Sequence, residues 1–248
     1  MASEALVRAI FVVLALATVG AFFLAQRLKS GAPPIERVYF QPVISPNGDG
    51  RKDSVTLRFD LPRPDRVEVA LVDSRGEVRR RLADERLGTG THRFPWNGLD
   101  DRGRRAPDGA YVLRVRLADQ GRTLLSPRTL TVDTVPPSPR VVAVTPATIV
   151  PGTSGRRGRA RIRYLGPTDP APEFTVLQAT ASRRGLRPVA QFVGPRFRQT
   201  ATWDGRVRGG RLAPSGRYVF GVRATDPAGN TSGRVPFPAE GVRVRARP

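Results

Sequence analysis

Apolar and polar residues alternate along most of the chain, in short runs that glycine and proline separate. Val55–Leu61 and Arg66–Val72 are representative, because each places apolar side chains at every second position. A period of two is typical of a strand that buries one face, and short strands bounded by turn residues indicate an all-β protein. The expected strands are Val38–Phe40, Val55–Leu61, Arg66–Val72, Glu77–Leu82, Thr91–Trp96, Tyr111–Leu117, Thr123–Val132, Val141–Val144, Ala160–Leu165, Phe174–Ala181, Val189–Val193, Thr200–Trp203, Tyr218–Thr225 and Val242–Ala246.

One apolar run at the N-terminus breaks this pattern. Residues 9–26 carry no charge, and Arg8 and Arg27 flank them. A run of about 18 residues is near the minimum length for a helix that spans a bilayer. A cleaved signal peptide is the alternative, but the run is longer than the usual apolar core of such a peptide and no small-x-small cleavage site precedes Arg27. We therefore expect an uncleaved, single-pass transmembrane α-helix.

The chain contains an internal repeat. Residues 94–119 align with the segment ending at residue 226 without a gap when they are shifted by 107 positions, which places Trp96 on Trp203. Such a match indicates a duplicated structural unit. In both copies an Asn-Gly or Asp-Gly turn follows the tryptophan, and a Pro-x-Gly turn precedes a strand. The matching residues include Gly98 with Gly205, Gly103 with Gly210, Pro107 with Pro214, Gly109 with Gly216, Tyr111 with Tyr218 and Asp119 with Asp226.

The spacing of the repeat divides the chain into two domains. After the N-terminal segment there is room for two domains of about 100 residues each, which agrees with the shift between the copies. Two proline-bearing segments, residues 30–35 and 134–140, are expected to be a stalk and a semi-rigid linker. We therefore expect an anchor over residues 1–29, the stalk, a first domain over residues 36–133, the linker, and a second domain over residues 141–248.

The repeated unit resembles the immunoglobulin-like domain found at the C-terminal end of flagellar hook-capping proteins and in many bacterial surface proteins. That family is marked by W-[DN]-G, a glycine in the following loop, and P-x-G-x-Y before a strand. The resemblance implies two tandem immunoglobulin-like β-sandwiches with structural marker residues, and it implies a fold rather than an activity. The marker residues are Trp96, Gly98, Gly109, Tyr111, Trp203, Gly205, Gly216 and Tyr218.

The segment from Ser45 to Asp53 is the candidate metal site. Asn47, Asp49 and Asp53 offer oxygen ligands of the kind that Ca²⁺ prefers, spaced through a loop that contains glycine. The segment resembles the SPNGDG-x-x-D motif of bacterial surface domains, but it lacks the closing glutamate of an EF-hand. Glycine, serine and glycine occupy the equivalent positions of the second copy, so the turn itself does not require a metal ion. Simple turn formation is the alternative, and no other cofactor is expected.

The chain is strongly basic, with a formal net charge of +21, and arginine supplies all but two of its 42 basic residues. Arginines that alternate along a strand share one face of a sheet. Such a face is either a solvated surface that discourages edge-to-edge aggregation or a binding site for the phosphates or carboxylates of an anionic polymer. No aromatic residues are interleaved to stack on bases, so nucleic acid is not an expected partner. The alternating sets are Arg114 and Arg116, then Arg159, Arg161 and Arg163, then Arg243, Arg245 and Arg247.

The sequence offers no recognisable catalytic constellation. It contains no cysteine, its single histidine is His92, and it has no G-x-S-x-G, Walker or G-x-G-x-x-G motif. Trp96 and Trp203 could stack on a ligand, but their positions at the ends of strands favour the core. We therefore do not expect an enzyme.

These features together predict a non-catalytic protein of the bacterial cell envelope. A helix over residues 9–26 would anchor it in the cell membrane, with both domains extracytoplasmic as a spacer, scaffold or docking module for another envelope protein. The charges that flank the helix do not decide its orientation, so the extracytoplasmic placement follows from the resemblance. The alternatives are an adhesion module for a polyanion or wall polymer, and an assembly factor related to the flagellar hook cap, although the N-terminal assembly segment of hook-capping proteins is absent.

Overall fold

The alternating segments of the first domain pair into two sheets. The computed structural model describes residues 35–180, 185–233 and 241–246, together with residues 14, 17–19 and 21. One sheet has the strand order β2-β8-β7-β4-β5 and the other has the order β1-β3-β6. The strands are β1 Glu36–Tyr39, β2 Val43–Ile44, β3 Val55–Leu61, β4 Asp65–Asp73, β5 Val78–Leu87, β6 Gly90–Trp96, β7 Gly109–Leu117 and β8 Arg122–Val132.

The second domain repeats this topology strand for strand. Its sheets have the orders β10-β16-β15-β12-β13 and β14-β11-β9, which are the orders of the first domain with eight added to each label. This correspondence is what the internal repeat predicts, and it confirms the all-β class of the fold. The elements are β9 Arg140–Thr145, β10 Thr148–Ile149, the 3₁₀ helix η1 Gly155–Gly158, β11 Ala160–Leu165, β12 Glu173–Ala179, β13 Leu186–Val193, β14 Thr200–Trp203, the 3₁₀ helix η2 Arg208–Gly210, β15 Gly216–Arg223 and β16 Gly241–Val244.

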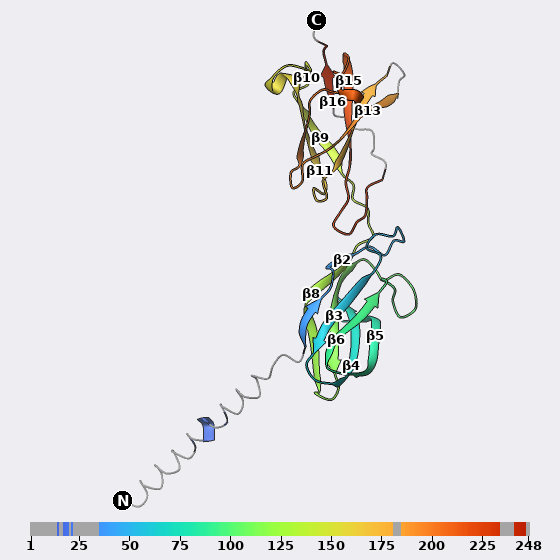
Figure 1. Ribbon diagram of the computed structural model, residues 1–248, viewed down its shortest axis with the longest axis vertical. Coiled ribbons are helices and arrows are strands. Elements are labelled where there is room, and N and C mark those ends of the chain that lie inside the picture. The colour runs from blue at the N-terminus through green and yellow to red at the C-terminus, as the bar shows by residue number, and fades with distance from the viewer. Residues whose placement is uncertain are drawn as a thin grey trace, which may run out of the picture.

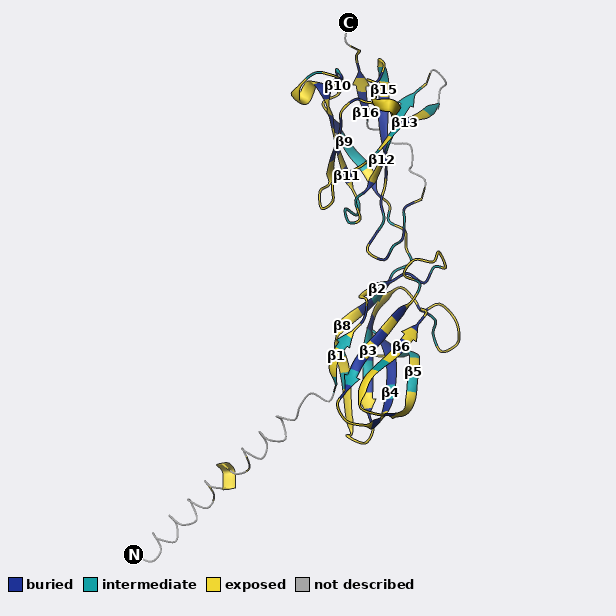
Figure 2. Ribbon diagram, viewed as in Figure 1, coloured by how far each residue is buried: buried dark blue, intermediate teal, exposed yellow. Residues whose placement is uncertain are grey.

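Each domain buries the apolar face of both its sheets in one core. Along β3 and β11 every second side chain is buried, as the period-two pattern predicts. Figure 2 shows buried and exposed positions alternating along strands of both domains. The largest side chains of the two cores occupy equivalent places, because Trp96 and Tyr111 in one correspond to Trp203 and Tyr218 in the other. The duplicated sequence unit is therefore the part of each domain that fills its core.

The structure differs from the sequence-based expectation mainly at short strands and edges. β2 and β10 were not expected, because two residues are too few to show alternation, and they pair in parallel with β8 and β16. β5 continues to Leu87 rather than ending at Leu82. Its last residues pair with β4 at the edge of the sheet, where polar side chains face solvent and no apolar alternation is needed.

The two domains follow one another along the long axis of the molecule (Figure 1). Residues 133–139 connect β8 of the first domain to β9 of the second. The transmembrane helix expected over residues 9–26 falls largely on residues outside the described part of the chain. Within the described residues, no helix has the length and apolar character that crossing a membrane requires.

The substitution Gly98→Ala should destabilise the first domain, because a Cβ atom at this position would lie 2.4 Å from Cβ of Pro46. Gly103→Ala is a matched control, since its φ of +72° is close to the +75° of Gly98 but a Cβ there would meet nothing within 4 Å. We expect Gly98→Ala to lower the free energy of unfolding by about 1–3 kcal/mol more than the control, as measured by urea denaturation. Equal losses would contradict the steric explanation.

Candidate functional site

Both tryptophans close the core instead of facing solvent. Trp96 is 2% exposed and Trp203 is 3% exposed. Each indole Nε1 donates a hydrogen bond of 2.8 Å to a carbonyl three residues further on, that of Leu99 in the first domain and that of Arg206 in the second. The two side chains therefore hold the start of the following loop, and they are not open platforms for a ligand.

The two tyrosines of the repeated unit, Tyr111 and Tyr218, make equivalent hydrogen bonds to the turns that precede their strands. The hydroxyl of Tyr111 donates to the carbonyl of Pro107 at 2.6 Å, and that of Tyr218 donates to the carbonyl of Pro214 at 2.8 Å. Burial raises the pKa of both hydroxyls, so both stay protonated and able to donate at neutral pH. The remaining marker glycines, Gly109 and Gly216, are the first residues of β7 and β15.

The side chains of the candidate calcium loop are engaged with the backbone of that loop. Asp53 accepts hydrogen bonds of 2.8 Å from Gly48 N and Gly50 N, one on each carboxylate oxygen. Asn47 Oδ1 accepts from Asp49 N, and Asp49 Oδ1 accepts from Arg51 N. In the part of the chain that the structure describes, no three acidic, histidine or cysteine side chains are grouped as a metal ion would need. These contacts favour the interpretation of the segment as a self-supporting turn.

The same loop makes the principal contact between the domains. Asn230, in the turn that follows β15, accepts hydrogen bonds on Oδ1 from Ser45 Oγ at 2.5 Å and from Asn47 Nδ2 at 3.2 Å. Its Nδ2 donates to the carbonyl of Asp133 at 2.8 Å and to Asp226 Oδ2 at 3.0 Å. Both protons and both lone pairs of this amide are therefore used, three of the four bonds crossing to the first domain.

Burial makes the Asn230 contact costly to break. Ser45 is fully buried and Asn230 is 1% exposed. Removing one bonding partner while the junction stays closed would leave a buried donor or acceptor unpaired, at about 1–3 kcal/mol for each group. Asp226 fixes the amide from its own side, since its Oδ1 also accepts from Asn230 N at 2.9 Å. The side-chain amide of Asn230 is therefore held in its orientation by a residue of its own domain.

A fourth hydrogen bond across the junction comes from Lys52. Its ammonium donates to the carbonyl of Pro227 at 2.5 Å. Lys52 has a φ of +53°, which is uncommon for a residue with a side chain, and its own carbonyl accepts from Ser45 N at 2.9 Å. The left-handed backbone therefore closes the loop and aims the lysine at the second domain.

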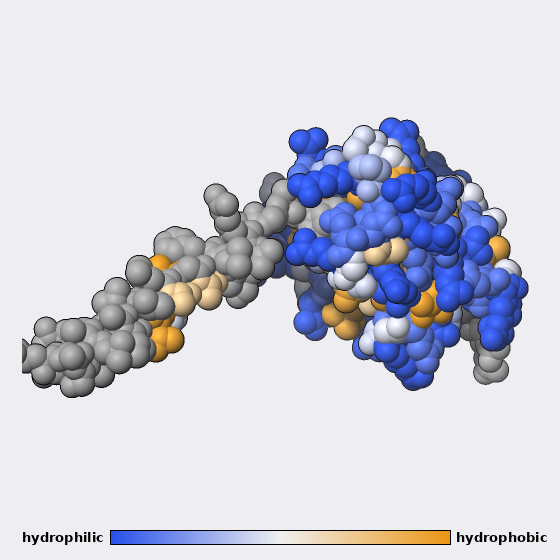
Figure 3. Space-filling view, turned by 90° about the horizontal axis from the view of Figure 1, so that it is seen from below, coloured by the Kyte–Doolittle hydropathy of each residue, from blue (hydrophilic) through white to orange (hydrophobic). Residues whose placement is uncertain are grey.

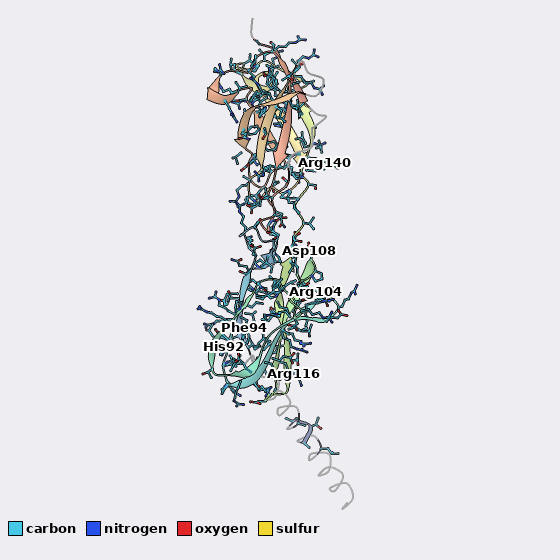
Figure 4. The ribbon with its side chains drawn as sticks, turned by 90° about the vertical axis from the view of Figure 1, so that its right-hand side faces the viewer. His92, Phe94, Arg104, Asp108, Arg116 and Arg140 are labelled. Carbon is cyan, nitrogen blue, oxygen red and sulfur yellow. The ribbon has the colours of Figure 1, made fainter. Side chains whose placement is uncertain are left out.

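The linker is tied to the first domain at its beginning. Thr134 N donates to Asp108 Oδ2 at 3.0 Å, and Val135 N donates to Asp133 Oδ1 at 3.0 Å. Figure 4 shows Asp108 at the end of the first domain that faces the second. The linker joins the two domains covalently, and the hydrogen bonds of Asn230 join them through side chains.

Sequence analysis predicted one junction residue for a different role and missed the others. Asn47 was a candidate metal ligand, and in the structure its amide meets Asn230. Neither Asn230 nor Lys52 was singled out, although Lys52 belongs to the segment from Ser45 to Asp53 that was the candidate metal site. The contact could not be predicted from local sequence, because Ser45 and Asn230 are 185 residues apart in the chain.

Charge is distributed unequally between the domains. Residues 36–133 carry 19 basic and 15 acidic side chains, whereas residues 141–248 carry 19 basic and only 5 acidic. In the first domain many arginines have carboxylate partners, for example Arg104 with Asp100 at 3.2 Å and Arg114 with Glu68 at 3.1 Å. Viewed from below, the surface is mainly hydrophilic, with small separate hydrophobic patches (Figure 3). The excess positive charge therefore belongs to the second domain.

His92 and the acidic pair in the turn after β6 are engaged locally. The Nε2 atom of His92 lies 2.8 Å from the carbonyl of Gly88. Asp100 accepts hydrogen bonds from Arg104 N and Arg102 N, which hold the pKa of its carboxyl below the usual 3.8 despite the opposing effect of burial. Asp101 Oδ1 accepts from Arg81 N at 2.9 Å. These groups stabilise the turn and form no acid–base pair.

Calcium ions should leave the melting temperature of the protein unchanged, because the carboxylate oxygens of Asp53 already accept two backbone N–H groups. Asp53→Ala should lower the melting temperature, since it leaves both donors unpaired. Calorimetric titration and thermal unfolding would measure the two effects. A binding heat that Asp49→Asn abolishes would contradict the turn interpretation and restore the metal site.

The folded protein should become less stable at acidic pH, because Asp100 becomes protonated there. A carboxyl whose pKa is lowered on folding stabilises the folded state above the unfolded value, here near 3.8, and that stabilisation is lost as the pH falls below it towards the folded pKa. Asp100→Asn should therefore be less stable than the wild type at neutral pH, and the difference should shrink below pH 3.8. Thermal unfolding at a series of pH values measures this, and a difference independent of pH would contradict it.

Comparison with known proteins identifies the fold of the first domain. Residues 43–121 match the family described as FlgD Ig-like domain. No curated protein sequence matches significantly. FlgD of P. aeruginosa is a similar solved structure, with 22% identity, a TM-score of 0.29, and coverage of 40% of this chain and 78% of that one.

Two further solved structures cover the chain differently. PorZ, a surface component of the type-IX secretion system of Porphyromonas gingivalis, is 19% identical with a TM-score of 0.26, and the similarity covers 39% of this chain and 11% of PorZ. The three N-terminal domains of the outer capsid protein Hoc of bacteriophage RB49 are 9% identical with a TM-score of 0.36, over 87% of this chain and 59% of that one. The family match therefore identifies residues 43–121 as an immunoglobulin-like domain of the FlgD type.

Proposed function

We propose that this protein is a non-catalytic spacer of the bacterial cell envelope, anchored in the cell membrane through residues 9–26 and carrying its two domains outside. The observation that supports this most directly is the junction at Asn230, whose amide makes hydrogen bonds to Ser45, Asn47 and Asp133 of the first domain. A junction held by buried bonds keeps the far end of the second domain at a fixed distance and direction from the first. That property suits a scaffold that presents another protein or a docking surface.

The family match is compatible with this role. An immunoglobulin-like domain of the FlgD type covers residues 43–121, and such folds are typically non-catalytic. Within the described residues, the buried polar side chains, among them Ser45, Asp65 and Asn230, all serve turns or the junction. The chemistry of the chain therefore supports connection rather than catalysis.

Location in the membrane is the first test of the proposal. The full chain, expressed in a bacterium, should sediment with the membrane fraction, and protease added to spheroplasts should cut both domains. A variant lacking residues 1–29 is the control, and it should stay soluble in the cytosol. Recovery of the full chain in the cytosol, or protection of its domains in intact spheroplasts, would contradict the proposal.

Rigidity of the junction is the second test. The double variant Ser45→Ala and Lys52→Ala removes two donors of the first domain without touching the second, so the second domain should keep its melting temperature while the inter-domain distance distribution becomes broader. Because the chain has no cysteine, spin labels can be placed at Thr123→Cys and Gln199→Cys and their distance measured by pulsed electron resonance. The same distribution in the variant and the parent would show that these bonds do not fix the domains.

Asn97→Ala provides the matched control for that measurement. Asn97 is an exposed residue whose Oδ1 accepts a bond of 3.3 Å from Leu99 N within its own turn, and its side chain takes no part in the hydrogen bonds to Asn230. It should leave the distance distribution of the labelled protein unchanged.

A further inference from the structure

The outer face of the smaller sheet in the second domain carries a row of arginines. In β11, Ala160, Ile162 and Tyr164 point into the core, so the alternate residues Arg161 and Arg163 are exposed on the outer face. Arg159 immediately precedes the strand and is exposed as well. Residues two apart on a strand are separated by about 7 Å. The three guanidinium groups therefore start from evenly spaced points along one line.

Threonines from both neighbouring strands flank this row. Arg161 is paired with Thr202 of β14 on one side and with Thr145 of β9 on the other. Arg163 is paired with Thr200 in the same way. Directly paired residues lie on the same face of a sheet, and all three threonines are exposed. The face thus offers hydroxyl donors beside guanidinium donors.

Two shallow recesses lie along the row and share Arg159 and Thr202. One, of about 480 Å³, is also lined by Arg156 and Arg161. The other, of about 490 Å³, is also lined by Arg206 and other residues of the loop that ends in η2. Because they share two lining residues, the recesses form one continuous track. We call this the arginine track, consisting of Arg156, Arg159, Arg161, Arg163, Thr145, Thr200 and Thr202.

The arginines of the track have no acidic partners among the described residues. Asp204, which lines the second recess, is paired with Arg206 at 3.4 Å. In the first domain, by contrast, the outer face of the matching strand β3 carries the exposed Thr56 and Arg58 and the half-buried Asp60. Asp60 lies 3.9 Å from Arg37 and accepts a hydrogen bond from Thr91. The fold therefore does not require the arginine track, and the first domain has the same sheet without it.

We propose that the arginine track binds a linear polymer with repeated phosphodiester groups and no aromatic bases. The oxygens of a phosphodiester are arranged tetrahedrally around phosphorus and accept hydrogen bonds from several directions, which suits guanidinium groups with hydroxyls on either side, whereas the two oxygens of a carboxylate lie in one plane. Repeated charge on the polymer matches the repeated arginines along the strand. This binding goes beyond the spacer function and does not depend on it.

The aromatic residues at the track are not available to stack on bases. Trp203 is 3% exposed. Phe192, which also lines the second recess, stacks on Phe174 with ring centroids 5.2 Å apart. Proteins that bind single-stranded nucleic acid generally need open aromatic faces. The geometry therefore favours a polymer of phosphate and polyol over nucleic acid.

The test uses the full chain in a neutral detergent and poly(glycerol phosphate) as the probe. The triple variant Arg159→Gln, Arg161→Gln and Arg163→Gln should weaken binding by about tenfold or more, and the slope of log affinity against log salt should become shallower by about 2–3. The matched control is Arg187→Gln, Arg223→Gln and Arg243→Gln, which removes the same charge from exposed positions of the other sheet. It should change affinity by less than about threefold.

Four outcomes would overturn the proposal. One is an equal loss in the two triple variants, which would mean that only net charge matters. Another is poly-glutamate binding as tightly as the phosphate polymer, and a third is an oligonucleotide or an anionic vesicle binding more tightly. Absence of any binding to the wild type also overturns it. If the triple variant unfolds, as judged by circular dichroism, Arg161→Gln alone should still weaken binding and make the salt slope shallower by about one.

Discussion

The contact between Pro46 and Gly98 is the constraint on which the arrangement of the first domain and its junction depends. The proline lies so close to the glycine that a Cβ atom could not fit, and Pro151 lies in the same way against Gly205 in the second domain. Trp96, which is part of the core, donates a hydrogen bond to the carbonyl of Leu99, next to this glycine. The core therefore contacts the turn at Gly98, and the turn contacts the loop that begins at Ser45. Three of the residues that bond to the second domain, Ser45, Asn47 and Lys52, are carried by that loop.

Much of the fold could be predicted because it repeats. Alternation identified the long strands such as β3 and β11, and the shared tryptophan unit showed that the two halves are built alike. The two-residue strands β2 and β10 could not be predicted, because hydrogen bonds to β8 and β16 define them and no side-chain pattern does. The junction was hidden for a similar reason. Asn230 contacts Ser45, a residue in another domain, and a turn sequence alone does not reveal its partner.

The candidate sites could be located from the sequence, but their roles could not be predicted from it. Carboxylates in the Ser45–Asp53 loop suggested a metal ion, but a carboxylate beside glycine can equally accept backbone N–H groups, as Asp53 does. Residue types therefore identified the loop but not its use. For the arginines, alternation correctly indicated a shared face, while the threonines beside them became visible only when the strand pairing placed Thr145 and Thr202 on either side of Arg161.

The parallel pairs β2–β8 and β10–β16 have a mechanical consequence. In each domain the early strand is bonded to the last strand by backbone hydrogen bonds, two of which are Thr131 N to Pro42 O and Asp133 N to Ile44 O in the first domain, and Arg243 N to Ala147 O and Arg245 N to Ile149 O in the second. A load that pulls the two ends of a domain apart would act on these parallel strands in shear. These bonds would then bear tension at once, whereas antiparallel strands pulled from one end would unzip bond by bond.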